Sequence, residues 1–85
     1  MKRAAIISVI LKNPQVSQAA FNNVVSGYHE IIEGRIGIPY KKGTTALISL
    51  IISADLDKVN EFISKLDMID GVIVNANITP EDIPI

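Results

Sequence analysis

The chain has 85 residues, 48% of them hydrophobic, and its 8 basic and 9 acidic side chains leave a formal net charge of -1. This length corresponds to one domain over residues 1–85, and the near-neutral charge provides no field that would attract nucleic acid or an anionic membrane. Cysteine is absent, which excludes disulfides, thiolate metal sites and cysteine nucleophiles and is compatible with the cytoplasm, where we expect the protein.

Residues 3–12 predict the first strand. The apolar run in it is too short to cross a membrane, and Lys12-Asn13-Pro14 follows it, which fits a strand better than a signal sequence. Both faces of the strand are largely apolar, which indicates a central strand covered on both sides. One face carries Ala5, Ile7, Val9 and Leu11, and the other carries Ala4, Ile6, Ser8 and Ile10.

Asn13 and Pro14 are typical of an N-cap and a first helical position, and Gly27 of a C-cap, so we expect a helix between them. No charged residue occurs from Pro14 to Tyr28. A neutral polar helix face is typical of a helix that a neighbour partly covers.

Residues 29–38 predict the second strand, and Lys41-Lys42-Gly43 an exposed hairpin tip. Gly34 and Gly37 indicate a bulge or a close approach by another backbone or a ligand. Pro39 cannot donate a ladder hydrogen bond, so this strand lies at an edge of the sheet or ends there. Residues 45–54 predict a third strand that is again largely apolar on both faces.

Asp55 is the expected cap of a second helix that runs to about Leu66, with a buried stripe at helical spacing. Asp70-Gly71 predicts a turn, residues 72–79 a last strand, and residues 80–85 an extended tail. The order β-α-β-β-α-β predicts an α+β, ferredoxin-like sandwich with an antiparallel four-stranded sheet and both helices on one face. Right-handed crossovers then place the first and third strands in the centre.

The sheet face opposite the helices is therefore predicted to be uncovered and apolar at its centre. Each aliphatic side chain left in water forgoes roughly 1.5–3 kcal/mol, so we expect a second subunit to stack on this face in a homo-oligomer, a dimer or a tetramer. The residues assigned to the face are Ile6, Ser8, Ile10, Leu47, Ser49, Ile51, Ile73, Asn75, Asn77, Glu33 and Arg35. The interface candidates among them are Ile6, Ile10, Leu47, Ile51, Ile73 and Arg35.

Arg35 admits two interpretations: a guanidinium that binds a carboxylate or phosphate at a subunit interface, or an ion pair with Glu33 or with an acidic group of a partner. Tyr28 and Tyr40 could stack on a planar ligand or simply pack edges and loops. Backbone N–H groups where the first strand meets the first helix could hold an anion or serve only as a helix cap. The ligand-binding candidates are Asn13, Gln15, Ser17, Gly34, Arg35, Gly37 and Tyr40.

Catalytic and metal-binding patterns are scarce. His29 is the only histidine, and with Glu33 it supplies two ligands, which make no site unless subunits pool them. An acylphosphatase-like enzyme would need an arginine in a glycine-rich loop after the first strand, where this chain has Lys12-Asn13-Pro14. A nucleic-acid-binding sheet would show aromatic residues on the central strands, which carry none. We predict no catalytic residues, no metal and no cofactor.

Glu33-Gly34-Arg35-Ile36-Gly37-Ile38-Pro39-Tyr40, the lysine-glycine turn and Ile48-Ser49-Leu50-Ile51 resemble the family of iron-only (FeFe) hydrogenase system regulators. The opening apolar strand and Gly71-Val72 extend the resemblance over nearly the whole chain. Such proteins are similar to stand-alone ACT-like domains and to the C-terminal domain of nickel-responsive regulators, which implies a cytoplasmic, oligomeric, ligand-sensing module. The nickel regulators use several histidines and a cysteine, so nickel sensing is not transferred to His29. No ribbon-helix-helix segment precedes the first strand, so direct DNA binding is not expected.

The resulting hypothesis is an ACT-like regulatory module, not an enzyme, that binds a small ligand or a partner protein at a subunit interface. The resemblance links it to hydrogenase regulation. The alternative is a purely structural oligomeric interaction module without a ligand. Arg35→Ala separates the two, because a ligand role predicts lost binding with assembly intact and a structural role predicts lost assembly.

Overall fold

The computed structural model describes residues 2–40 and 44–81, so the predicted tip at Lys41-Lys42-Gly43 and the end of the tail lie outside the described residues. The elements in order are β1 (Arg3–Leu11), α1 (Pro14–Ser26), the 3-10 turn η1 (His29–Ile31), β2 (Ile32–Tyr40), β3 (Thr45–Ala54), α2 (Leu56–Asp67) and β4 (Val72–Ile78).

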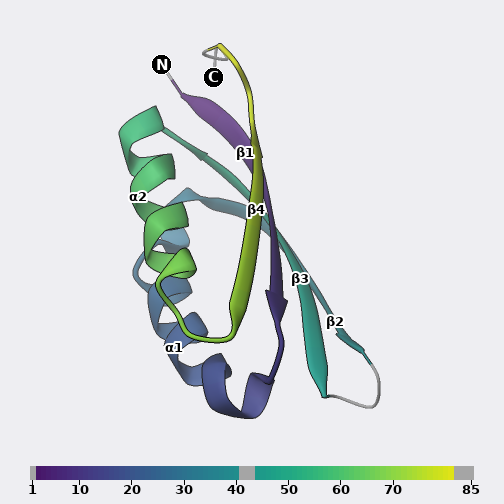
Figure 1. The fold of residues 1–85 in the computed structure, drawn as a ribbon. Coiled ribbons are helices and arrows are strands. Elements are labelled where there is room, and N and C mark those ends of the chain that lie inside the picture. The colour runs from purple at the N-terminus through teal and green to yellow at the C-terminus, as the bar shows by residue number, and fades with distance from the viewer. Residues whose placement is uncertain (1, 41–43, 82–85) are drawn as a thin grey trace.

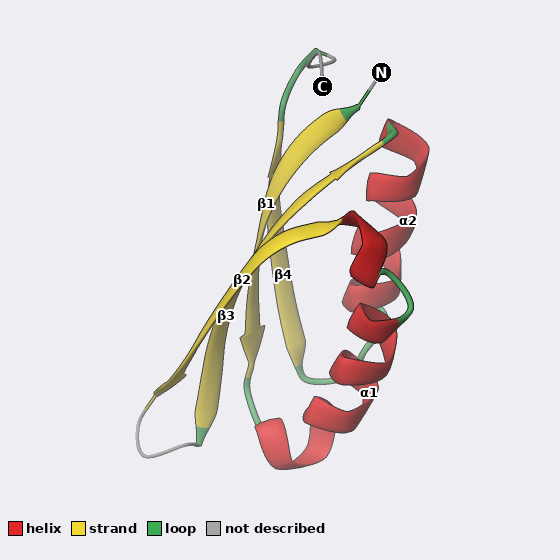
Figure 2. Cartoon of the chain, turned by 180° about the vertical axis from the view of Figure 1, so that it is seen from behind, coloured by secondary structure: helices red, strands yellow, loops and turns green. Residues whose placement is uncertain are grey.

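The strands form one antiparallel sheet in the order β2-β3-β1-β4, and both helices pack on the same face of it (Figures 1 and 2). This is the predicted ferredoxin-like α+β sandwich, with β1 and β3 in the centre. The ends of β2 and β3 extend away from the helical layer (Figure 2), and the described chain measures 41 × 19 × 19 Å. No helix in the described ranges is long and apolar enough to cross a membrane.

The core lies between the helices and alternate residues of the central strands. Ile7 pairs with Leu50 across β1 and β3, and both side chains are fully buried. The helices contribute Phe21 from α1 and Phe62 from α2, which are also fully buried. The apolar stripes predicted for β1, β3 and α2 therefore meet in one core, and burial of each such side chain stabilises the fold by roughly 1.5–3 kcal/mol.

The helix ends agree with the predicted positions but differ in detail. Asn13 is the N-cap of α1, yet its side chain makes no cap hydrogen bond; instead the Ser17 hydroxyl donates to the Asn13 carbonyl oxygen at 3.1 Å. Gly27 ends α1 in a right-handed conformation that any residue adopts. Gly71 has φ of 77°, which favours glycine, and its carbonyl accepts a hydrogen bond from the Lys12 N–H at 3.0 Å. The predicted Asp70-Gly71 turn is confirmed.

Two buried serines should respond oppositely to alanine. The Ser17 hydroxyl has its bond to Asn13, whereas the Ser53 hydroxyl has no hydrogen-bond partner among the described residues. Ser17→Ala should lower the free energy of unfolding by about 1 kcal/mol, and Ser53→Ala should leave it unchanged or raise it, because an unsatisfied hydroxyl is removed. Urea denaturation of both variants checks this, and a larger loss for Ser53→Ala than for Ser17→Ala would contradict it.

The second strand departs most from its prediction. Residues 29–31 form η1, and β2 runs from Ile32 to Tyr40. The register shifts between Ile32 and Gly34, so Glu33 is an extra residue opposite β3, which is the bulge that the glycines predicted. Beyond it Arg35 pairs with Leu50, a residue of the helix-facing core.

The prediction that Arg35 lies on the open sheet face is therefore wrong. Side chains of a strand alternate between faces, and one inserted residue reverses that alternation for everything after it. Ile36, Ile38 and Tyr40 lie on the open face instead. They pair across the strands with Ser49, Leu47 and Thr45 of β3, in that order. Pro39 is accommodated because β2 is an edge strand, as predicted.

Candidate functional site

The first candidate surface is the open face, meaning the side of the sheet without helices. Its central row contains Ile36, Ser49, Ser8 and Asn75 in register across the four strands. The row on one side contains Gly34, Ile51, Ile6 and Asn77, and the row on the other contains Ile38, Leu47, Ile10 and Ile73. None of these positions carries a charge, so the face is a polar row between two largely aliphatic rows.

Exposure concentrates on this face. Of the ten large hydrophobic side chains exposed among the described residues, seven lie on it, with exposed fractions between 37% and 65%. They are Ile6, Ile36, Ile38, Tyr40, Leu47, Ile51 and Ile73. Single exposed apolar residues are ordinary, but a contiguous patch of them is typical of an interaction surface. Five of the six predicted interface residues, all except Arg35, lie on the face.

The second candidate site is a hollow of about 270 Å³ on the opposite side of β2, next to the first half of α1. Gln18 and Pro14 border it from α1, Arg35 and Gly37 border it from β2, and Ile48 of β3 lies beneath them. The Arg35 guanidinium carbon lies 5.4 Å from the centroid of the Phe21 ring, within the range of a cation–π contact. We call this the Arg35 hollow.

The predicted ligand-binding residues are only partly brought together. Arg35 and Gly37 line the Arg35 hollow, whereas Asn13 and Gln15 are exposed at the start of α1 outside its lining. The Ser17 hydroxyl is engaged with Asn13. Gly34 and Tyr40 belong to the open face. Gln18, which lines the hollow, was not among the predicted ligand-binding residues; its spacing of four residues from Pro14 places both on one side of the helix.

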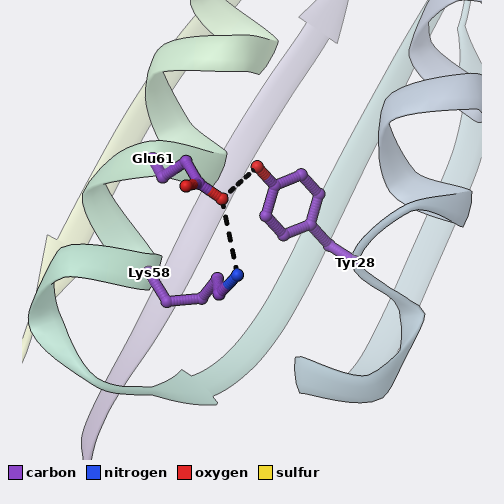
Figure 3. A network of polar contacts seen from close by, with 3 residues as sticks. All are labelled: Tyr28, Lys58 and Glu61. Atoms are coloured by element: carbon purple, nitrogen blue, oxygen red, sulfur yellow. Dashed lines mark hydrogen bonds and ion pairs between the residues drawn. The ribbon is translucent and has the colours of Figure 1, made fainter.

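A third cluster joins the two helices and was not foreseen as a site. The Tyr28 hydroxyl donates a hydrogen bond to Glu61 Oε2 at 2.5 Å, and Lys58 Nζ lies 3.6 Å from the same oxygen (Figure 3). The ammonium groups of Lys58 and Lys65 lie 5.7 and 5.6 Å from the centroid of the Tyr28 ring. These residues border an open hollow of about 450 Å³.

The hydrogen bond between Tyr28 and Glu61 shifts the pKa of both side chains. Donation to Glu61 raises the pKa of Tyr28, with burial as a further cause. The same bond, with the nearby Lys58 charge, lowers the pKa of Glu61. The cluster thus favours a neutral phenol and an ionised carboxylate, which is an arrangement suited to holding α1 and α2 together rather than to proton transfer.

This pair should make stability depend on acid pH. Because folding lowers the pKa of Glu61, its contribution is present above the pKa of an unfolded glutamate and is lost as the pH falls through the folded value. Tyr28 has a raised pKa, so its contribution is lost only as the pH rises through that value. Urea denaturation at pH 3 and pH 7 should show a smaller difference for Glu61→Gln than for the unaltered chain; equal differences would contradict it.

His29 lies on η1 and not on a strand. Its Nδ1 is 3.2 Å from the Ser26 carbonyl oxygen, and the side chain is exposed. Within residues 2–40 and 44–81, no group of three or more histidine or acidic residues could hold a metal ion. His29 and Glu33 were predicted to share one face of a strand, but His29 lies on η1 and Glu33 on β2.

The fold and these surfaces define a small ferredoxin-like α+β domain with one uncovered apolar sheet face. The chain belongs to the TM1266-like family, described as "Iron-only hydrogenase system regulator, putative", whose model matches residues 3–76. It is also similar to the solved structure of uncharacterized protein TM1266 from Thermotoga maritima. The two are 25% identical with a TM-score of 0.86, over 93% of this chain and 99% of that chain. No curated protein matches the chain.

Proposed function

We propose that the protein is a non-catalytic, ACT-like regulatory module that assembles through its open face and binds a small ligand or a partner protein at a subunit boundary. The observation that carries the proposal is the open face, where uncharged positions hold most of the exposed large hydrophobic side chains. The family description supports a regulatory role in an iron-only hydrogenase system, and the resemblance to ACT-like modules supports a cytoplasmic setting.

The pattern on the open face favours a second copy of the chain as the occupant. The polar Ser8 row lies between two aliphatic rows, one with Ile6 and one with Ile10. A two-fold axis between two stacked sheets, running across the strands at the Ser8 row, lays each aliphatic row on the opposite aliphatic row. The same axis brings serine and asparagine side chains together, where they can exchange hydrogen bonds. None of the positions in these three rows carries a charge that the stacking would bury.

A ligand would then act through the equilibrium between assembly states. A small molecule shifts that equilibrium only to the extent that it binds one state more tightly than the other. Binding at a subunit boundary gives such a difference, because part of the site exists only in the assembled state. A partner protein bound at the same boundary would act in the same way.

Sedimentation velocity over a wide range of protein concentration tests the assembly. The proposal expects a dimer or tetramer that persists at high salt, because its contacts are apolar and are not screened. A monomer at every concentration would overturn it. Native mass spectrometry of the same sample reads the subunit count and any retained small molecule; an assembly with no retained or added ligand would favour the purely structural module.

A further inference from the structure

We infer that the Arg35 hollow is a binding site for a small monocarboxylate with an apolar body. The inference goes beyond the proposed function, because this hollow lies on the helix side of the sheet and not at the boundary that the open face would form. It starts from the cation: Arg35 makes no ion pair with Glu33 or with any other described residue. A guanidinium that lacks an acidic partner is available to form paired hydrogen bonds with a carboxylate.

The guanidinium is also held in place. Its carbon lies 5.4 Å from the ring centroid of Phe21, and Phe21 is fully buried in the core. A cation–π contact is made with the charge of the guanidinium, which has five N–H donors and so retains donors for an anion. Because the Phe21 ring is part of the core, contact with it restricts the Arg35 side chain before a ligand binds. Ligand binding should therefore cost less side-chain entropy at Arg35 than it would at a freely moving arginine.

The residues that line the hollow indicate the polarity and the size of the ligand. The lining beside Arg35 is mostly apolar, with Pro14, Pro39 and Ile48 among its members. A Cβ added at Gly37 would lie 3.8 Å from Ile48 Cγ1, an ordinary contact distance, so the glycine leaves space above Ile48 that an apolar group can occupy. A volume of about 270 Å³ lies below the usual range for drug-sized ligands and suits a compact molecule.

The charge of the hollow selects a single negative charge. Among the residues that the structure describes, Arg35 is the only charged one in the lining, and the first turn of α1 contains no acidic residue. One guanidinium balances one carboxylate, while a phosphate dianion would remain partly uncompensated among apolar walls. The Gln18 amide is positioned on the α1 side, where it can donate a second hydrogen bond to the same carboxylate or accept one from a polar substituent of the ligand.

Nuclear magnetic resonance titration of the full chain tests the inference with three probes: isovalerate, benzoate and cyclohexanecarboxylate. At least one should shift the Gly37 amide, the Gln18 side-chain amide and the Arg35 Nε–H signals with saturation. Its neutral amide analogue should bind at least about tenfold more weakly, because the hydrogen-bonded charge pair is lost. Inorganic phosphate should also bind at least about tenfold more weakly, because it has no apolar body and its second negative charge would lie uncompensated among apolar side chains. Saturable shifts with none of the three carboxylates, or equal binding of a carboxylate and its amide, would overturn the inference.

Variants locate the site. Arg35→Gln should weaken the responding carboxylate by about tenfold or more. Gly37→Val should abolish binding by filling the space above Ile48, and Gly37→Ala is the milder variant if valine disturbs the strand. Lys65→Gln, which removes a cation from the cluster around Tyr28, is the matched control and should bind unchanged. Unchanged binding by a folded Arg35→Gln protein would overturn the assignment.

This test is separable from that of the proposed function. Arg35 lies on the helix side of the sheet, whereas the proposed assembly uses the other side. Carboxylate binding by a protein that is monomeric at all concentrations would contradict the proposed assembly and support the proposed binding site. Stable assembly without carboxylate binding would support the proposed assembly and overturn the proposed binding site.

Discussion

Ile6→Lys is expected to convert the assembled protein into folded monomers. Ile6 lies on the central strand β1 in one of the aliphatic rows of the open face, and 49% of its surface is exposed in the single chain. The single chain should tolerate lysine there, with a change in the free energy of unfolding within about 0.5 kcal/mol. In a stacked assembly the same ammonium would be buried without a partner, at a cost of several kcal/mol.

The expected effect on the assembly is a dissociation constant raised by at least about a hundredfold, since each 1.4 kcal/mol corresponds to a factor of ten. Sedimentation velocity reads this constant, and circular dichroism checks that the monomer is folded. Val16→Lys is the matched control, because Val16 is an aliphatic residue on α1 with 73% of its surface exposed. If Val16→Lys dissociates the protein and Ile6→Lys does not, the interface is on the helical side and the proposed assembly is wrong.

Phe62→Ala is expected to remove most or all of the stability of the domain. Phe62 lies on α2, is fully buried, and its ring centroid is 4.7 Å from that of Tyr28. Truncation of a buried phenylalanine costs about 3–5 kcal/mol through lost transfer free energy and the cavity left behind. A domain of this length has only about 4–13 kcal/mol in total, so a large part of the protein should be unfolded.

Urea denaturation at a fixed protein concentration measures this loss, since association also contributes to apparent stability. Leu56→Ala is the control on the same helix; Leu56 is 38% exposed and should cost clearly less. Phe62→Leu keeps an apolar side chain in the same place and gives a measurable transition if the alanine variant does not fold. A loss below about 1 kcal/mol for Phe62→Ala would mean that the core relaxes around the cavity.

Whether a candidate site could be predicted from the sequence depended on whether its residues follow a local pattern. The open face consists of alternating positions in four strands, and for β1, β3 and β4 the alternation is visible in the sequence. Ile6, Ile10, Leu47, Ile51 and Ile73 were therefore placed on it correctly. The Tyr28–Glu61 hydrogen bond joins residues 33 positions apart, one on a loop and one on a helix. The local sequence pattern of neither segment predicts contact with the other.

Local patterns in the chain were enough for the order of the elements, the central place of β1 and β3 and the apolar stripes of the core. Side-chain period, capping residues and breakers act over a few residues, so they can be read without knowing the fold. The side of the sheet on which Arg35 lies required the paired strands. Glu33 bulges because the register of β2 against β3 places one extra residue before Gly34. That register is set by contacts between strands, and it moves Arg35 from the open face to the ring of Phe21.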